Sequence, residues 1–191
     1  MSTIPDTTAG DEILATWGQA VTDYLNGRTS IAAATGNIDD SPQVQVVGLT
    51  IDADSLIAGS TYRLTGYGVA SNSAGSDQSL TLRVRIGPTT LTGEIACSRA
   101  PNIVNGAAGE GFGCEFIFTV RTAGASGTCI ANGWSMSGPA NPLNTNAYVT
   151  QGTSTVAVDT TVANVLELTA VTGHASATAN FTVATIERLT P

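Results

Sequence analysis

The chain has 191 residues, which is long enough for one sizeable hydrophobic core or two small ones. Hydrophobic residues make up 42% of it and charged residues only 12%; lysine is absent, and seven arginines against fifteen acidic residues leave a formal net charge of −8. A surface of that sign repels phosphate backbones and anionic lipid, which argues against nucleic-acid and membrane partners.

Targeting signals and cysteine usage both indicate folding in a cytoplasm. Residues 1–12 carry neither a basic region nor an apolar run, so no secretory signal is expected. No stretch reaches the roughly 20 apolar residues of a membrane span. The cysteines Cys97, Cys114 and Cys129 are an odd set without a C-x-x-C spacing, and buried thiols are expected rather than a disulfide or a metal site.

The first predicted element in chain order is an amphipathic α-helix over residues 11–26. Asp11 and Glu12 suit its first turn, because carboxylates oppose the positive end of the helix dipole. Asn26-Gly27 is a suitable stop, since glycine tolerates the left-handed conformation that closes a helix. Six large apolar side chains recur at the spacing of one helical face and are the candidate interface: Ile13, Leu14, Trp17, Val21, Tyr24 and Leu25.

The segments around this helix complete a predicted N-terminal arm, residues 1–42. Residues 1–10 are expected to be an extended lead, and residues 28–42 a linker to the rest of the chain. We expect the arm to serve attachment or oligomerisation, with its apolar face on a neighbouring copy or on a larger assembly. The alternative is that the helix packs on its own β domain as a lid.

Residues 43–191 are predicted to form one β domain. In residues 78–87, Leu80, Leu82, Val84 and Ile86 alternate with polar side chains, as a sheet with one wet face requires. Turn-rich segments separate the candidate strands, and no helix intervenes. The pattern predicts an all-β, antiparallel, jelly-roll-like sandwich of eight or nine strands, with candidates at 43–51, 61–71, 78–87, 89–96, 112–121, 126–136, 147–158, 163–171 and 178–189.

No motif in the chain specifies catalysis, a metal or a cofactor. His174 is the only histidine, and a single imidazole without a nearby cysteine makes no convincing zinc site. The glycine-rich residues 109–113 lead into a predicted strand rather than a helix, so they are not expected to bind phosphate. The close acid pairs, Asp39-Asp40 and Asp52 with Asp54, are too few for a calcium site, and the second pair is expected to cap a turn.

Two aromatic residues deserve a separate interpretation. Trp134 and Tyr148 are of the type that stacks on sugars on the surface of β-sandwiches. Aromatic residues make up only 5% of the chain, however. A core or subunit-contact role is the preferred interpretation for each.

Several motifs carry a resemblance to a known class of proteins. They are Gly59-Ser-Thr-Tyr62-Arg63-Leu64, the strand from Gly75 through Leu80-Thr-Leu-Arg83-Val-Arg85, and the ending from Ala179-Asn180 to Leu189. With them, residues 61–91 and 158–189 resemble the jelly-roll structural domains of tailed-bacteriophage virions. Residues 9–26 look like the opening of phage decoration, fibre and minor tail proteins. The resemblance implies a virion structural protein without catalytic residues, assembled in the host cytoplasm and commonly trimeric.

The resemblance leaves two placements in a virion open. The first hypothesis is a capsid decoration protein, a homotrimer bound to the major capsid protein on the head surface. The alternative is a tail fibre, baseplate or minor tail protein whose loops 98–111 and 137–146 present a surface to host saccharide. A remote alternative is a carbohydrate-active β-sandwich enzyme, which generally requires two carboxylates about 5–10 Å apart.

Overall fold

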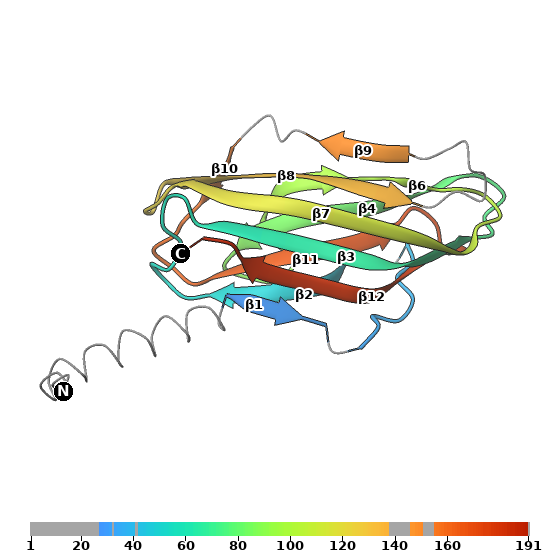
Figure 1. Ribbon diagram of the computed structural model, residues 1–191, viewed down its shortest axis with the longest axis horizontal. Coiled ribbons are helices and arrows are strands. Elements are labelled where there is room, and N and C mark those ends of the chain that lie inside the picture. The colour runs from blue at the N-terminus through green and yellow to red at the C-terminus, as the bar shows by residue number, and fades with distance from the viewer. Residues whose placement is uncertain (1–26, 32, 41, 138–145, 151–154, 191) are drawn as a thin grey trace, which may run out of the picture.

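The structure, a computed structural model, describes residues 27–31, 33–40, 42–137, 146–150 and 155–190. Two antiparallel sheets pack face to face, and the predicted all-β sandwich is thereby confirmed (Figure 1). The predicted helix over residues 11–26 lies outside the described residues.

The first sheet has seven strands, and β3 and β7 lie at its middle. Its strands follow the order β1 (Arg28–Ser30), β12 (Ala177–Arg188), β3 (Thr61–Asn72), β7 (Ala108–Thr122), β8 (Gly127–Ser137) and β10 (Val156–Val158), and β9 (Asn146–Thr150) also pairs with β8. The second sheet has five strands in the order β2 (Val44–Ile51), β11 (Asn164–Thr172), β4 (Gln78–Gly87) and β5 (Glu94–Arg99), with β6 (Asn102–Ile103) beside β4. Strands distant in the chain are therefore neighbours in both sheets.

The core fills the space between the sheets with one side of each strand. The predicted alternation in β4 is confirmed, since Leu80, Leu82, Val84 and Ile86 are all buried. From the opposite sheet, Phe112 and Phe181 meet edge to face, with ring centroids 4.8 Å apart. Gly66 on β3 makes room for this contact, because a Cβ atom there would lie 2.7 Å from the ring of Phe181.

The expected linker over residues 28–42 contributes to the seven-stranded sheet. Arg28–Ser30 forms β1 against β12, and Ile38 forms a bridge with Ala179. Ile38 is also buried in the core, at 2% exposure. A three-residue strand and a single bridge are too short to show a period of two, so the sequence pattern could not indicate them.

The boundaries of other predicted strands also differ from the structure. The expected strand 147–158 is two strands, β9 and β10, and β6 was not expected. The strand expected from residue 112 begins four residues earlier, at Ala108, as β7. These additions take the sheets beyond the predicted eight or nine strands.

The expected strand 89–96 begins only at Glu94, because a buried carboxylate holds the preceding segment in a turn. Leu91 has a φ of 65°, and its backbone N–H donates to Glu167 Oε1 at 2.6 Å. Gln45 Nε2 donates to the other oxygen of Glu167 at 2.7 Å. Glu167 is only 1% exposed, so these bonds replace its lost hydration.

Candidate interaction surface

The predicted interface residues cannot be placed, because Ile13, Leu14, Trp17, Val21, Tyr24 and Leu25 lie outside the described residues. The outer face of the seven-stranded sheet carries the exposed apolar side chains of the described residues that lie together on one surface. On β3, the outward positions begin with the polar Thr61, Arg63 and Thr65 and continue with Tyr67 and Val69. The outer face therefore changes from polar to apolar along one strand.

Four outward side chains form what we call the apolar row: Tyr67, Val69, Met136 and Val183. Strand register aligns three of them, since Val183 on β12 pairs with Tyr67, Tyr67 pairs with Gly113 on β7, and Gly113 pairs with Met136 on β8. Each member of the row is between 43% and 49% exposed. Large apolar side chains from three strands thus share one face.

Gly113 allows Tyr67 to lie against the sheet. A Cβ atom at Gly113 would lie 3.0 Å from Tyr67 Cδ1 and 3.1 Å from Cε1, so the ring covers the backbone of β7 there. A bulge in β12 between Phe181 and Val183 leaves both Thr182 and Val183 exposed. These two local features leave the apolar groups of Tyr67 and Val183 on the outer surface of the sheet.

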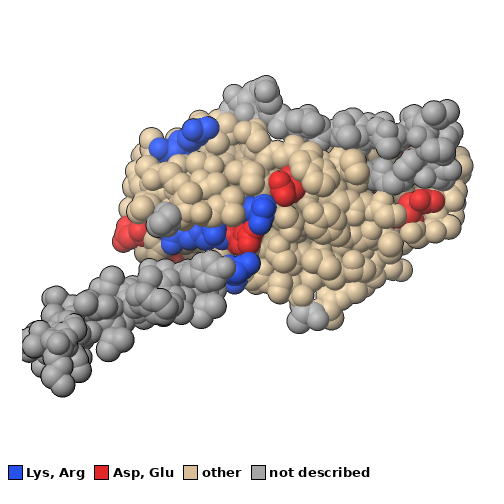
Figure 2. Space-filling view, viewed as in Figure 1, with Lys and Arg blue, Asp and Glu red and all other residues tan. Residues whose placement is uncertain are grey.

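The end of this face near Gly27 carries opposite charges instead. Arg28 Nη2 lies 3.1 Å from Glu187 Oε2, and the guanidinium of Arg63 donates to Glu187 Oε1. Figure 2 shows that charged side chains are sparse over the rest of the view. We call Arg28, Arg63 and Glu187 the arginine–glutamate cluster. Partly exposed ion pairs contribute about 0–1 kcal/mol each, so this cluster marks a charged rim rather than a major source of stability.

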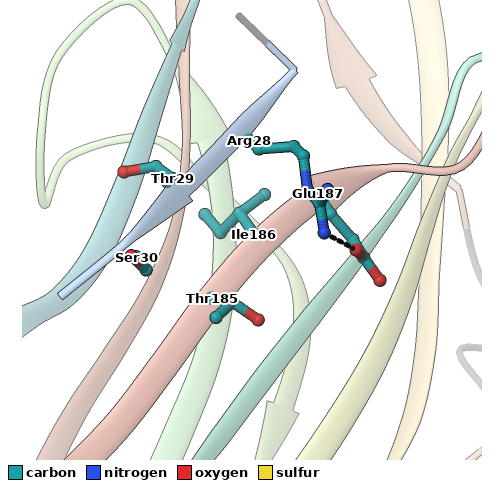
Figure 3. A pocket seen from close by; sticks show the side chains of 6 residues that line it. All are labelled: Arg28, Thr29, Ser30, Thr185, Ile186 and Glu187. Atoms are coloured by element: carbon teal, nitrogen blue, oxygen red, sulfur yellow. Dashed lines mark hydrogen bonds and ion pairs between the residues drawn. The ribbon is translucent and has the colours of Figure 1, made fainter. Parts of the chain in front are cut away.

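A shallow hollow of about 320 Å³ lies at the cluster (Figure 3). Only short segments line it: Arg28, Thr29, Ser30, Thr185, Ile186 and Glu187. Its walls come from two neighbouring strands, β1 and β12, rather than from both sheets.

The residues considered for catalytic, metal-binding or phosphate-binding chemistry lie in separate turns and strands of the described structure. His174 lies in the turn before β12, where its Nδ1 accepts a hydrogen bond from the backbone N–H of Ser176 at 3.0 Å. Asp54 adopts a φ of 61° and its N–H donates to the Thr160 carbonyl. The glycine-rich residues 109–113 lie within β7 itself rather than in a loop before it, and no helix follows them. Within the described ranges, no three His, Cys, Asp or Glu side chains come together as a metal site.

The prediction of buried thiols is confirmed, since Cys97, Cys114 and Cys129 are buried and free. Burial raises the pKa of Cys114 from its ordinary value of 9.0 to about 12. Burial, with a smaller contribution from the Glu94 charge, raises the pKa of Cys129 to about 12 as well. All three thiols face the core and are unsuited to chemistry at the surface.

We expect Cys114 and Cys129 to resist maleimide labelling at pH 8 until urea unfolds the chain. Because their pKa values are higher in the folded state than in the unfolded state, their contribution to stability is complete below about pH 9. It is lost as the pH rises toward about 12. Intact mass after labelling and thermal melts between pH 8 and 11 test both expectations. Rapid labelling of the native protein, or a Cys114→Ala variant with the same pH slope as the wild type, would contradict them.

The aromatic residues considered for sugar binding occupy neighbouring strands. Trp134 is half-buried on β8 and pairs with Glu115 on β7. Tyr148 lies on β9 and pairs with Ser135. Of the loops considered for saccharide, residues 98–111 include β6 and the start of β7, whereas residues 138–145 lie outside the described chain.

The apolar row was absent from the sequence interpretation, although a signal existed. In residues 61–71, apolar side chains occupy both the inward and the outward positions from Tyr67 onward. That departure from alternation marks an outer face with apolar character. Glu167 was missed for a different reason, because an acid inside a predicted strand is usually assigned to the wet face.

In the part of the chain that the structure describes, no helix has the length and apolar character needed to cross a membrane.

Comparisons with known proteins give structural neighbours only. No protein family matches the sequence, and no curated protein matches it. The infectious bursal disease virus VP2 subviral particle is 13% identical with a TM-score of 0.31, covering 83% of this chain and 32% of that one. The Gx strain of the same virus gives 10% and 0.30 with the same coverage, and the Gt strain gives 13% and 0.28, covering 84% and 30%. The chain spans about a third of the length of these neighbours.

Proposed function

We propose that the chain is a virion structural protein with a jelly-roll domain, and specifically a decoration protein of a tailed-bacteriophage head. The strand order is the observation that carries the proposal. In one sheet β2 lies beside β11 and β11 beside β4, and in the other β12 lies beside β3. The beginning and the end of the chain are thus rolled together, as in the jelly rolls of viral capsid proteins and lectins.

The motifs that resemble phage virion proteins supply the centre of this roll. Residues 61–91 contain β3 and β4, and residues 158–189 contain β11 and β12. These two stretches pair with each other in both sheets, through β3 with β12 and β4 with β11. This pairing favours the virion class over lectins with the same roll, because the resembling residues are the ones that build the domain.

A decoration protein needs surfaces rather than a reaction centre. The apolar row and the arginine–glutamate cluster supply such a surface on the seven-stranded sheet. The net charge of −8 favours basic or neutral patches of the capsid shell as the partner. We propose a homotrimer as the bound form, with residues 1–26, the part of the predicted arm that precedes β1, as the attachment or oligomerisation segment.

A density map of purified particles tests the placement. Copies in the hundreds on the head surface are expected. A few to tens of copies on the tail, and none on tail-less heads, would replace the decoration role with the receptor-binding or minor tail role. Absence of the chain from all particles would overturn the virion proposal itself.

Trp17→Ala is expected to weaken oligomer formation or incorporation into particles more than it affects the sandwich. A large side chain contributes about 1.5–3 kcal/mol when fully buried, and Trp17 is the largest on the predicted helical face. Sedimentation at several concentrations measures the first effect, and the β-domain melting temperature measures the second. An unchanged oligomer with a markedly lower melting temperature would assign the helix to its own domain.

A further inference from the structure

We infer that Arg83 and Arg85, on the outer face of the five-stranded sheet, bind a carboxylate group of a partner protein. The inference goes beyond the proposed function, because it concerns the other sheet and names the chemistry of a ligand. We call these two residues the arginine pair. They are alternate residues of β4, so both side chains project from the same face, and both are partly exposed.

A single side-chain amide holds the two guanidinium groups together. Arg83 Nη1 donates to Gln43 Oε1 at 2.8 Å, and Arg85 Nη2 donates to the same oxygen at 2.9 Å. The Gln43 amide is itself oriented, because its Nε2 group donates to Thr169 Oγ1. Thr169 lies opposite Arg83 on β11 and is fully buried. The arginine pair is thus held in place before any ligand binds, which lowers the entropic cost of binding.

Arg83 presents an unused fork of N–H groups. Its Nη1 group donates to Gln43, whereas within the described residues Nε and Nη2 have no hydrogen-bond partner, and neither atom is buried. The Nε and Nη2 groups lie side by side on one edge of the guanidinium, where they can donate to both oxygens of a carboxylate. Both Nη groups of Arg85 are occupied, by Gln43 and by the Gly93 carbonyl, the latter at 2.7 Å. Arg83 is therefore the residue that binds the ligand, and Arg85 contributes the second positive charge.

Glu167 offsets one of these two charges. It lies opposite Arg85 on β11 and is 1% exposed. It forms no ion pair with either arginine in the part of the chain that the structure describes, and its two oxygens already accept hydrogen bonds from Leu91 and Gln45. Two guanidinium charges against one carboxylate leave one net positive charge on this face.

The other described acids of neighbouring segments lie away from the fork. Glu94 acts toward the opposite sheet, where its charge adds to the effect of burial in raising the pKa of Cys129. Asp39, next to Asp40, accepts the N–H of Thr172 through its carbonyl, roughly 10 Å along β11 from the level of the arginine pair. One net positive charge matches a single carboxylate. A phosphate with two charges is disfavoured, because the chain as a whole carries a net charge of −8.

A titration of the full chain, resolved for each arginine by NMR, tests the inference. The probe is the peptide Gly-Gly-Glu-Gly-Gly with both ends blocked, and the Nε–H signals of the seven arginines report binding. We expect the Arg83 signal to shift most and to saturate at a several-fold lower peptide concentration than the signal of Arg121. Arg121 is an exposed arginine on β7 and serves as the internal reference. The same peptide with Gln in place of Glu is expected to leave the Arg83 signal unshifted.

Three variants separate the fork from charge alone, with the affinity measured from the backbone N–H signals of β4. Arg83→Gln should weaken peptide binding several-fold, whereas Arg121→Gln removes the same charge from the other sheet and should leave the affinity unchanged. Gln43→Glu should also weaken binding, because a carboxylate of the chain itself would then lie between the two arginines. It keeps both arginines and therefore remains informative if Arg83→Gln does not fold.

Each contrary result has a definite meaning. Equal shifts at all arginines, equal binding of the Gln peptide, or an unchanged affinity in Arg83→Gln and Gln43→Glu would overturn the inference. Tighter binding of inorganic phosphate than of the Glu peptide at the same ionic strength would overturn the choice of a carboxylate. The titration needs no particles, so its failure would leave the virion proposal standing. Absence of the chain from particles would likewise leave the carboxylate site standing.

Discussion

Gly68→Ala is expected to lower the free energy of unfolding by about 3 kcal/mol or more. A Cβ atom at Gly68 would fall far inside van der Waals contact of the Asn180 carbonyl oxygen and 2.9 Å from the ring of Phe112. The Asn180 backbone belongs to β12, which is paired with β3 along almost its full length. Because the hydrogen bonds between β3 and β12 hold the Asn180 carbonyl oxygen in place, it cannot move away from the new Cβ atom without breaking the strand pairing.

Gly111→Ala is the matched control for that substitution. Gly111 lies on the adjacent strand β7, and a Cβ atom there would meet nothing within 4 Å. Replacement of such a glycine by alanine restricts the unfolded chain, so stability should stay unchanged or rise by up to about 1 kcal/mol. Urea unfolding of both variants measures the difference. Similar midpoints for the two would show that β3 and β12 do not approach as closely as described.

Phe181→Ala is expected to cost about 3–5 kcal/mol. Its ring is fully buried, meets Phe112 edge to face and fills the space left by Gly66. Gly66 has no side chain to fill the resulting cavity, and the backbone of the paired strands cannot move into it. Val162→Ala, at an exposed position, is the control and should change stability by less than about 0.5 kcal/mol. A loss of only about 1 kcal/mol for Phe181→Ala would mean that the two sheets can close over the cavity.

Both substitutions, Gly68→Ala and Phe181→Ala, act on the strand pair β3 and β12, which also positions the apolar row. Phe181 points inward at the start of the bulge in β12, and Val183 points outward at its end. Gly68 lies between Tyr67 and Val69, the two members of the apolar row on β3. Core packing at this pair therefore determines where the outer apolar groups lie. Variants of the row should be interpreted only when this inner packing is retained.

The fold class and several strands could be predicted from local pattern alone. The prediction of a strand at 78–87 coincides with β4, and that at 163–171 differs from β11 by one residue at each end. Alternation works there because one face of each strand is apolar and the other is wet. It fails at 89–96, where a hydrogen bond from Leu91 to Glu167, 76 residues away, replaces strand with turn.

The candidate site was predictable only in part. The apolar spacing of Ile13, Trp17 and Val21 identifies a surface that requires a partner, and it stays a prediction because these residues lie outside the described chain. The apolar row could not be recognised from the spacing of residues in the sequence, because strand order brings Val183 and Met136 onto the same face as Tyr67. In the sequence, Val183 is 47 positions from Met136 and 116 positions from Tyr67. These side chains share one face only after the sheet has formed.

By itself, the sequence determined that this protein is a β-sandwich, that its thiols are buried and that its surface is acidic and poor in charge. These properties follow from composition and from a period of two, which act locally along the chain. Only the tertiary structure decided which strands are neighbours, that residues 28–30 join a sheet, and that Glu167 is buried. The physical reason is that alternation assigns side chains to faces, whereas partners and register depend on contacts between distant segments, such as Phe181 with Gly66 and Phe112.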